Sequence, residues 1–353
     1  MEQVSNSGRR QPLPDIVLDS QLKTEITDGK TIHSFLKSDP ARRKRPRRVE
    51  ESWVRRTKLG SGSFGEVWLE ICVGGPQQGS RRAVKEIKKS QSAENHAREL
   101  EAIAKFSQQP VCSGGAQVAS GVPLSLDANT NAFKYRDWFV RSHGWFETDS
   151  TVFIAMEYLE HGDLQQFLDA PFPEPEARSV TCQALEALQY MHTNGFTHRD
   201  LKPGNILVLH SRPDWWVKLA DFGMSKRVDQ DTALRSFVGT IQYLAPELHR
   251  FDEKQKGPSY TSAVDVWALG LIAYRMMTGQ AAFPGNLELF TYTMGGPFPS
   301  DLLVQSSASA ECCDFIEKSL APSAAARLTA DSGLMHAWIK MADEDATVDN
   351  PSR

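Results

Sequence analysis

Four polar residues between positions 200 and 221 have side chains suited to the transfer of a phosphoryl group. Asp200, Lys202 and Asn205 lie within six residues, and Asp221 follows sixteen residues after Asn205. A carboxylate can accept the proton of an attacking hydroxyl, an ammonium can neutralise charge on a phosphate, and carboxamide and carboxylate oxygens are suitable ligands for Mg²⁺. Asp200, Lys202 and Asn205 are therefore candidate catalytic residues, and Asn205 and Asp221 are candidate metal ligands.

A second cluster, earlier in the chain, has the composition of a phosphate-binding hairpin. Residues 59–67 read LGSGSFGEV, and glycines allow a backbone to approach phosphate groups without side-chain clashes. A similar spacing occurs in dinucleotide-binding turns. Here, however, Val67 continues a strand instead of beginning a helix, and the strand residues Ala83 and Lys85 follow. This order favours a hairpin, and an exposed strand lysine is the alternative interpretation of Lys85.

The elements that must hold these residues change in type along the chain. Alternating apolar residues predict strands from Val54 to Ile87, and helical spacing predicts a helix over 92–106. Beyond Tyr158 helical spacing predominates, and the predicted helices are 175–192, 261–278, 287–294, 310–320 and 330–339. A small, sheet-rich half therefore precedes a larger, mainly helical half, and the predicted fold class is α+β.

The segment HRDLKPGN at 198–205, followed by DFG at 221–223, resembles the catalytic signature of the eukaryotic protein kinase family. The resemblance covers residues 53–340. It implies the bilobal protein kinase fold, with a small antiparallel-sheet N-lobe that has one helix and a larger, mainly helical C-lobe. The lobes would comprise residues 53–156 and 160–340.

Two further segments indicate which branch of the family the chain resembles. Lys202, together with GTIQYLAPE at 239–247, resembles the serine/threonine type. The latter segment and the hinge residue Met156 are most similar to the calcium/calmodulin-dependent and checkpoint-like group, and residues 214–220 resemble fungal members. The implied activity is therefore that of an ATP-dependent protein serine/threonine kinase.

The resemblance implies ATP and Mg²⁺ as cofactors. Asp200 would act as the base for the substrate hydroxyl, Lys202 would contact the γ-phosphate, and Asn205 and Asp221 would ligate Mg²⁺. The main chain of the hinge would hydrogen-bond the adenine. The residues implied in ATP binding are Leu59, Gly60, Gly62, Gly65, Val67, Ala83, Lys85, Glu99, Met156, Glu157, Leu159, Asp163 and Asp221.

Two of these assignments have alternatives. Lys85 needs an acidic partner on the helix that follows it, for which Glu94, Glu99 and Glu101 are candidates. Glu99 best resembles the family's helical motif, so we expect a Lys85–Glu99 ion pair. Asp163 matches an acidic position that touches the ribose, and an aspartate that caps the next helix is an equal alternative.

The resemblance also implies a scaffold and a switch. Glu247 should pair with a buried Arg327, and Asp265 should anchor the backbone of the catalytic loop. Arg199 precedes the base, where an arginine in this family pairs with a phosphorylated activation loop. Phosphate on Ser236 would then order the loop, which implies an upstream activating kinase.

The implied partners are protein substrates with serine or threonine acceptors. Related kinases that select arginine two residues before the acceptor carry acidic residues at two positions that Gly204 and Arg275 occupy here. Both acids are absent and one is replaced by a cation. We therefore expect no preference for arginine at that position.

The flanking segments differ in composition from the kinase-like region. Residues 1–52 are predicted to form a disordered, basic N-terminal tail, and residues 341–353 an acidic C-terminal tail. Residues 107–132 are predicted to be an insertion in the N-lobe, and an error in the gene model is an alternative. The basic run from Arg42 to Arg48 is a solvated arm, a nuclear localisation signal or a contact for anionic partners.

Composition excludes several other classes of protein. The chain has a net charge of −4 and no run of eighteen apolar residues, so no membrane segment is expected. No aromatic platform accompanies the basic run, so no direct binding of nucleic acid is expected. The acidic C-terminal tail lacks the basic amphipathic helix that calmodulin binds. The predicted location is the nucleus or the cytoplasm.

Two competing functions remain at the level of the sequence. A pseudokinase would usually lack the strand lysine, the base or the metal-binding aspartate, whereas Lys85, Asp200, Asn205 and Asp221 are all present. A kinase of small molecules or lipids would not need the 240–247 segment, which forms a protein-substrate groove in the family.

Overall fold

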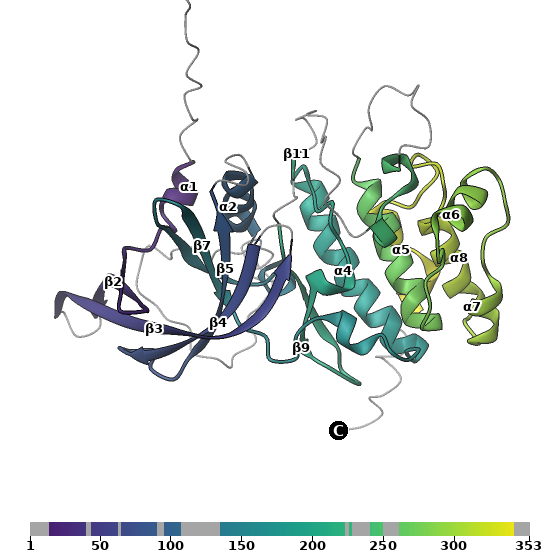
Figure 1. The fold of residues 1–353 in the computed structure, drawn as a ribbon. Coiled ribbons are helices and arrows are strands. Elements are labelled where there is room, and N and C mark those ends of the chain that lie inside the picture. The colour runs from purple at the N-terminus through teal and green to yellow at the C-terminus, as the bar shows by residue number, and fades with distance from the viewer. Residues whose placement is uncertain are drawn as a thin grey trace, which may run out of the picture. The chain divides into compact units, whose positions relative to one another are not determined.

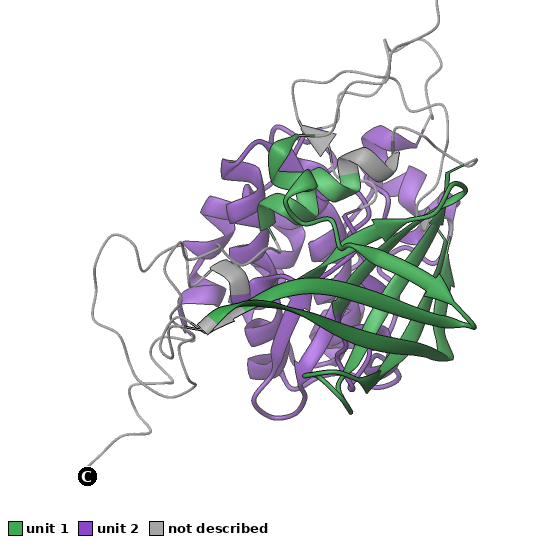
Figure 2. Ribbon diagram, turned by 90° about the vertical axis from the view of Figure 1, so that its left-hand side faces the viewer, with its two compact units in different colours: residues 1–116, 142–156 green, residues 117–141, 157–353 purple. Residues whose placement is uncertain are grey.

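The computed structural model divides the chain into two compact units (Figure 2), residues 1–116 with 142–156 and residues 117–141 with 157–353. The first unit contains a large sheet and the second is mainly helical, which confirms the α+β class. The structure describes residues 14–39, 44–62, 65–89, 95–106, 135–222, 226–227, 241–249 and 261–341.

The first unit is built on a seven-stranded sheet with the order β1-β2-β3-β4-β5-β7-β6 (Figure 1). Strands β1 to β5 pair antiparallel in succession, and β6 pairs antiparallel with β7. Among the described residues of this unit, two helices accompany the sheet, the short α1 (Asp15–Leu18) and the longer α2 (Asn95–Phe106). The strands are β1 (Thr24–Thr27), β2 (Lys30–Asp39), β3 (Lys44–Gly62), β4 (Gly65–Gly74), β5 (Arg81–Lys88), β6 (Ser142–Glu147) and β7 (Thr151–Glu157).

The prediction of a disordered tail up to residue 52 is wrong for most of that segment. Residues 15–18 form α1, and β1, β2 and the first part of β3 extend the sheet. The segment before β1 is also fixed to β6, because Trp145 donates through its indole to the carbonyl oxygen of Val17 (2.8 Å) and Leu22 N–H donates to that of Trp145 (2.7 Å). Residues 1–13 and 40–43 lie outside the described residues.

The N-terminal strands are held by a network of buried polar side chains. The low hydropathy of these strands had indicated a solvated segment instead. Arg82 is buried and donates to Glu70 Oε2 from Nε (3.0 Å) and Nη2 (2.7 Å), while its guanidinium lies 4.1 Å from the ring centroid of Trp53. Arg82 Nη1 lies 2.8 Å from Nε2 of the buried His33. Arginine can only donate, so Nε2 accepts and the proton resides on Nδ1, which lies 2.8 Å from Thr24 Oγ1.

We expect this histidine to make the stability of the first unit depend on pH. Burial, and then the charge of Arg82, lower the pKa of His33 from 6.5 to about 3. The unfolded chain therefore binds a proton that the folded chain excludes. As the pH falls from 6.5 towards 3, His33 should reduce the free energy of unfolding by up to about 1.4 kcal/mol per pH unit.

Urea unfolding at a series of pH values, followed by tryptophan fluorescence, measures this slope. His33→Gln is the control, because its amide oxygen can still accept from Arg82 but does not titrate. Between pH 6.5 and 5 the native chain should lose stability faster than the variant. Parallel curves would exclude His33 as the titrating group.

The second unit is organised around two long helices, α4 (Glu174–Thr193) and α5 (Ala263–Thr278). Both lie at the predicted positions, and almost every residue of α5 is buried. Two antiparallel strand pairs, β9 (Ile206–His210) with β10 (Trp216–Leu219) and β8 (Phe196–Thr197) with β11 (Lys226–Arg227), follow α4. The other helices are α6 (Asn286–Thr293), α7 (Asp301–Gln305), α8 (Ala310–Ser319) and α9 (Ala330–Leu334). Among the described helices, none has the length and apolar character needed to span a membrane.

Candidate active site

The predicted glycine-rich hairpin is formed by β3 and β4. Gly60 pairs with Val67 and Gly62 with Gly65, and Val67 in turn lies opposite Lys85 on β5. Gly65 has φ +132°, and a Cβ there would overlap the carbonyl oxygen of Glu86, so this position requires glycine. The tip of the hairpin, residues 63 and 64, lies outside the described residues.

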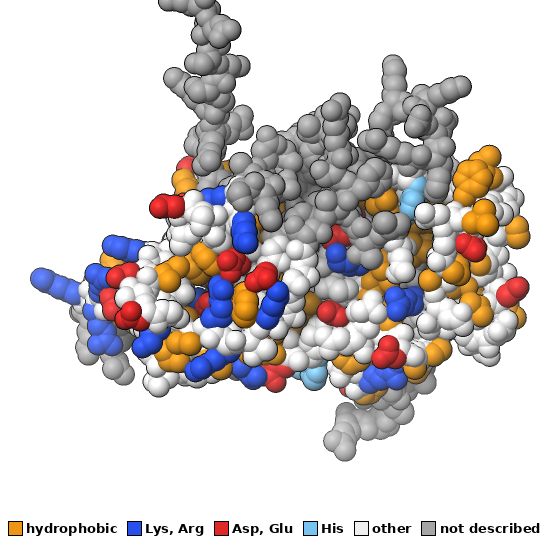
Figure 3. Space-filling model, in the orientation of Figure 1, with side chains coloured by type: hydrophobic (Ala, Val, Ile, Leu, Met, Phe, Trp, Pro, Cys, Tyr) orange, Lys and Arg blue, Asp and Glu red, His pale blue; other side chains and the backbone are white. Residues whose placement is uncertain are grey.

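Charges on this hairpin are paired across strands. Lys58 Nζ lies 2.6 Å from Glu66 Oε1, and Arg55 Nη1 lies 3.1 Å from Glu86 Oε2. Basic and acidic side chains accordingly alternate over this part of the surface (Figure 3). The charge at the base of the hairpin is therefore balanced locally.

The expected ion pair between Lys85 and Glu99 is present. Lys85 Nζ lies 2.5 Å from Glu99 Oε1, and both side chains are buried, at 6% and 4% exposure. The pair joins β5 to α2, and α1 lies against α2 in turn (Figure 1). The N-terminal segment therefore supports the helix that holds the partner of Lys85, a contact that sequence motifs did not indicate. Of the alternative partners, Glu94 lies outside the described residues.

The catalytic loop brings its three predicted residues together. Lys202 Nζ donates to Asp200 Oδ2 (2.7 Å), and Asn205 Nδ2 donates to the carbonyl oxygen of Asp200 (2.7 Å) and to its Oδ2 (3.3 Å). These contacts assign the amide nitrogen of Asn205, so its Oδ1 faces away from Asp200. Asp200 and Asn205 are buried, whereas Lys202 is partly exposed.

The loop is anchored from below by Asp265 of α5, as the sequence predicted. Its Oδ1 accepts from Arg199 N–H and its Oδ2 from His198 N–H, each at 2.8 Å, and Oδ2 also lies 2.8 Å from His192 Nε2. Burial opposes ionisation of Asp265, but hydrogen bonding to His192 and the loop main chain outweighs it and lowers the pKa of this carboxyl. Asp265 is therefore an ionised, buried anchor for the catalytic loop.

The backbone is strained at two positions that flank the chemistry. Arg199 has φ 70° and Asp221 has φ 62°, in the left-handed region that non-glycine residues rarely adopt. His198 donates from Nε2 to the carbonyl oxygen of Ala220 (3.0 Å), and the buried Phe222 packs 6.0 Å from its ring. Such strain persists only where surrounding contacts impose it, and here the contacts of Ala220 and Phe222 hold the backbone on both sides of Asp221.

The hinge residue Glu157 has a role that the sequence did not indicate. Its Oε1 accepts from Arg141 N–H and from Nζ of Lys218, each at 2.7 Å, and Lys218 is almost completely buried. Its own N–H donates to the carbonyl oxygen of Arg141 (2.9 Å). Glu157 therefore fixes the start of the second unit. These hydrogen bonds use its side chain and its N–H, and none of them uses its carbonyl oxygen. Met156 is half-buried at the end of β7, and Leu159 is buried.

Asp163 lies just before a short 3₁₀ helix, Leu164–Phe167, but makes no side-chain cap hydrogen bond to it. Its Oδ1 is buried and accepts no hydrogen bond from a described residue, and burial raises the pKa of this carboxyl. A buried acceptor without a donor is costly unless a ligand satisfies it. The N–H groups of Gln165 and Gln166 at the start of that helix act against this rise in the pKa, so the ribose contact and the helix cap both remain predictions for Asp163.

The predicted scaffold pair between Glu247 and Arg327 is confirmed. Arg327 binds the carboxylate with both terminal nitrogens, at 2.9 and 3.0 Å, and its side chain is fully buried. It also donates to the carbonyl oxygens of Ala263 and Ala321. Ala321 thus contributes a main-chain acceptor to the arginine.

Several predicted features fall on residues that the structure does not describe. These are the activation-loop segment with Ser236 and Thr240, Gly223, the insertion at 107–132 and most of the C-terminal tail. The run Arg42–Arg48 is described only from residue 44, where it belongs to β3, and Arg45, Arg47 and Arg48 are exposed.

Comparison with known proteins identifies the family. The protein kinase domain family matches residues 132–339, which is more than half of the chain. The serine/threonine-protein kinase cds1 of Schizosaccharomyces pombe is 35% identical over 207 residues, 56% of this chain and 44% of that protein. RAD53 of Saccharomyces cerevisiae, also a serine/threonine-protein kinase, is 35% identical over 213 residues, 57% of this chain and 26% of that protein. The chain thus spans less than half the length of these two relatives.

Two longer matches extend beyond the range of the family match. Aurora kinase of Saccharomyces cerevisiae is 30% identical over 284 residues, which cover 80% of this chain and 67% of that protein. The crystal structure of Rad53 1-466 in complex with AMP-PNP superposes with a TM-score of 0.61 at 28% identity, covering 81% of this chain and 65% of that one. The predicted kinase fold and the similarity to fungal serine/threonine kinases are confirmed. The chain therefore belongs to the protein kinase family.

Proposed function

We propose that this chain is a protein serine/threonine kinase that uses ATP and Mg²⁺, with Asp200 as the base. The observation that carries the proposal is the catalytic loop, in which Lys202 and Asn205 both donate to the carboxylate of Asp200. Asp265 holds the main chain of this loop. The buried Lys85–Glu99 pair supports it from the first unit. A pseudokinase would have no need to keep all these contacts.

The two oxygens of Asp200 are not equivalent. Oδ2 accepts from Lys202 Nζ and Asn205 Nδ2, whereas Oδ1 accepts no hydrogen bond from any residue that the structure describes. Oδ1 is therefore the oxygen that would orient a substrate hydroxyl and accept its proton. Lys202 uses one of its three donors on Asp200, so two remain for the oxygens of the phosphoryl group.

The donor set of the second unit fits Mg²⁺ and a nucleotide. When bound, Mg²⁺ would neutralise the charge that develops on the phosphoryl group during transfer. Magnesium sites of this kind use one or two protein oxygens together with phosphates and water, and the described residues hold no larger cluster of acidic, histidine or cysteine ligands. Asn205 Oδ1 and the Asp221 carboxylate would serve here. The unpaired Oδ1 of Asp163 fits a ribose hydroxyl.

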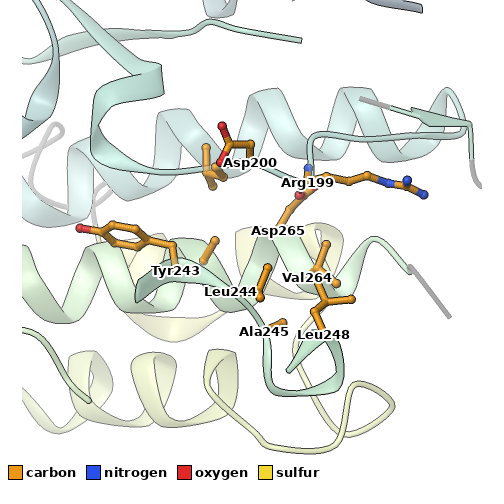
Figure 4. Close-up of a pocket in the computed structure, with 10 residues that line it drawn as sticks. Arg199, Asp200, Tyr243, Leu244, Ala245, Leu248, Val264 and Asp265 are labelled. Atoms are coloured by element: carbon orange, nitrogen blue, oxygen red, sulfur yellow. Dashed lines mark hydrogen bonds between the residues drawn. The ribbon is translucent and has the colours of Figure 1, made fainter. Parts of the chain in front are cut away.

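Control by phosphorylation is the finer part of this proposal. The side chain of Arg199 extends away from the carboxylate of Asp200 (Figure 4). Arg199 would pair with a phosphate on the segment that follows β11, such as one on Ser236, which an upstream kinase would add. The exposed arginines of the 42–48 run are the reason to propose a nuclear as well as a cytoplasmic location.

A transfer assay tests the activity. The purified chain is incubated with Mg²⁺ and γ-labelled ATP and with three peptides that differ only in a serine, threonine or tyrosine acceptor. We expect label on serine and threonine but not on tyrosine, and no transfer after EDTA removes the metal. A thermal shift with ATP reports binding separately. Nucleotide binding with no labelled peptide would indicate a pseudokinase, and label on a sugar or lipid alone would indicate a different substrate class.

A further inference from the structure

A half-buried arginine is hydrogen-bonded to a tyrosine that lines the pocket containing the carboxylate of Asp200. Asp200 and Tyr243 line the same pocket (Figure 4), and Arg275, near the C-terminal end of α5, donates from Nη1 to the phenol oxygen of Tyr243 (3.1 Å). Both side chains are half-buried. No carboxylate among the described residues lies within ion-pair distance of Arg275. Within the part of the chain that the structure describes, its charge therefore has no acidic partner.

The hydrogen bond between these residues creates a site with donors only. Arginine cannot accept, so the tyrosine oxygen accepts and its O–H must point elsewhere. Burial raises the pKa of Tyr243 above its ordinary value, which keeps this proton in place. Among the described residues, the hydrogen bond that the Tyr243 oxygen accepts from Arg275 is the only one that this hydroxyl makes, so its proton is donated to none of them. The unused guanidinium N–H groups add further donors.

Such a pair requires an acceptor from outside, and an anion satisfies both the donors and the charge. Resting on the proposed kinase function, we propose that Arg275 and Tyr243 form a subsite for an acidic side chain of the peptide substrate, close to the acceptor residue. A basic side chain would meet the uncompensated guanidinium and be rejected. The sequence predicts only that the enzyme does not select arginine, whereas this subsite would also select an acidic side chain.

The test uses a peptide with a single serine in a neutral background, in which glutamate, glutamine or lysine replaces each flanking position in turn. We expect one position where the glutamate peptide has a kcat/KM about 5–10-fold above the glutamine peptide, the size of one partly screened charge-assisted hydrogen bond. Lysine should be worse than glutamine there. A native enzyme that prefers glutamate at no position would overturn the proposal.

Variants identify the residues responsible, and the glutamate-to-glutamine ratio is taken within each variant. Arg275→Gln should bring the ratio to about one, Arg275→Glu should favour lysine at the same position, and Tyr243→Phe should give an intermediate ratio. If Arg275→Gln keeps the native ratio and instead abolishes activation by phosphate on the 228–240 segment, Arg275 serves the chain's own phosphate and the proposal fails.

A binding measurement separates this subsite from catalysis. Fluorescence polarisation of the labelled peptides on the Asp200→Asn variant requires no phosphoryl transfer. Tighter binding of the glutamate peptide, lost in Asp200→Asn/Arg275→Gln, supports the subsite even if no variant transfers phosphate. Equal binding of the glutamate and glutamine peptides, together with active transfer to neutral peptides, would refute the subsite and leave the kinase function intact.

Discussion

Replacing Asp200 by asparagine should reduce kcat for peptide phosphorylation by about 10²–10⁴-fold, the usual contribution of a positioned general base. An amide keeps the size of the side chain but has no basic oxygen to accept the hydroxyl proton. The loop should persist, because Asn205 still donates to the backbone carbonyl of residue 200 and Asp265 still holds the main chain of His198 and Arg199. The measurement is the steady-state rate of labelled phosphate transfer.

Asp169→Asn is the matched control, since this aspartate is exposed in the same unit and contributes no contact to the loop. It should retain the native rate. Urea unfolding of both variants should give midpoints close to the native one, which separates a loss of chemistry from a loss of fold. If Asp200→Asn transferred phosphate at more than a tenth of the native rate, Asp200 would not be the base.

The parts of the site that could be predicted from sequence are those whose spacing is short or whose partner occupies a recognisable motif. Asp200, Lys202 and Asn205 are close in sequence, so the loop that unites them was evident. The Lys85–Glu99 and Glu247–Arg327 pairs span longer separations, and they were found because each partner belongs to a motif of the family.

The contacts that could not be predicted join residues with no such motif. His33 and Arg82 are separated by 49 positions, and Glu157 and Lys218 by 61. Hydropathy treats all four as surface residues, whereas each is buried or half-buried through a hydrogen bond to its distant partner. A strand whose polar side chains are buried through hydrogen bonds to other strands has the same composition as a solvated tail. The prediction that the N-terminal strands are disordered was wrong for this reason.

The same reasoning explains why the burial of Asp163 Oδ1 could not be foreseen. A capping aspartate and a ligand-binding aspartate occupy the same position before a helix, so the sequence could not show that Oδ1 of Asp163 is buried without a hydrogen bond from a described residue. Similarly, the sequence showed that Arg275 replaces an acid, but not that its guanidinium donates to the phenol oxygen of Tyr243.

Arg82→Met should be the most destabilising single substitution that we propose, lowering the free energy of unfolding by about 3–5 kcal/mol. Methionine fills a similar volume over Trp53 but leaves Glu70 buried at 2% exposure without its cation. It also removes the hydrogen bond to His33 that ties β2 to β5. Urea unfolding followed by tryptophan fluorescence is informative, because Trp53 and Trp145 are both buried in this unit.

Arg81→Met, at the exposed neighbouring position of the same strand, is the control and should change stability by no more than about 0.5 kcal/mol. Adding Glu70→Gln to Arg82→Met removes the unpaired charge, so the double variant should be more stable than the two single effects predict when added. Strict additivity, or an Arg82→Met midpoint equal to that of Arg81→Met, would show that the network does not hold the N-terminal strands. A measured coupling would instead mean that residues of the presumed tail belong to the cooperative core of the unit that carries Lys85.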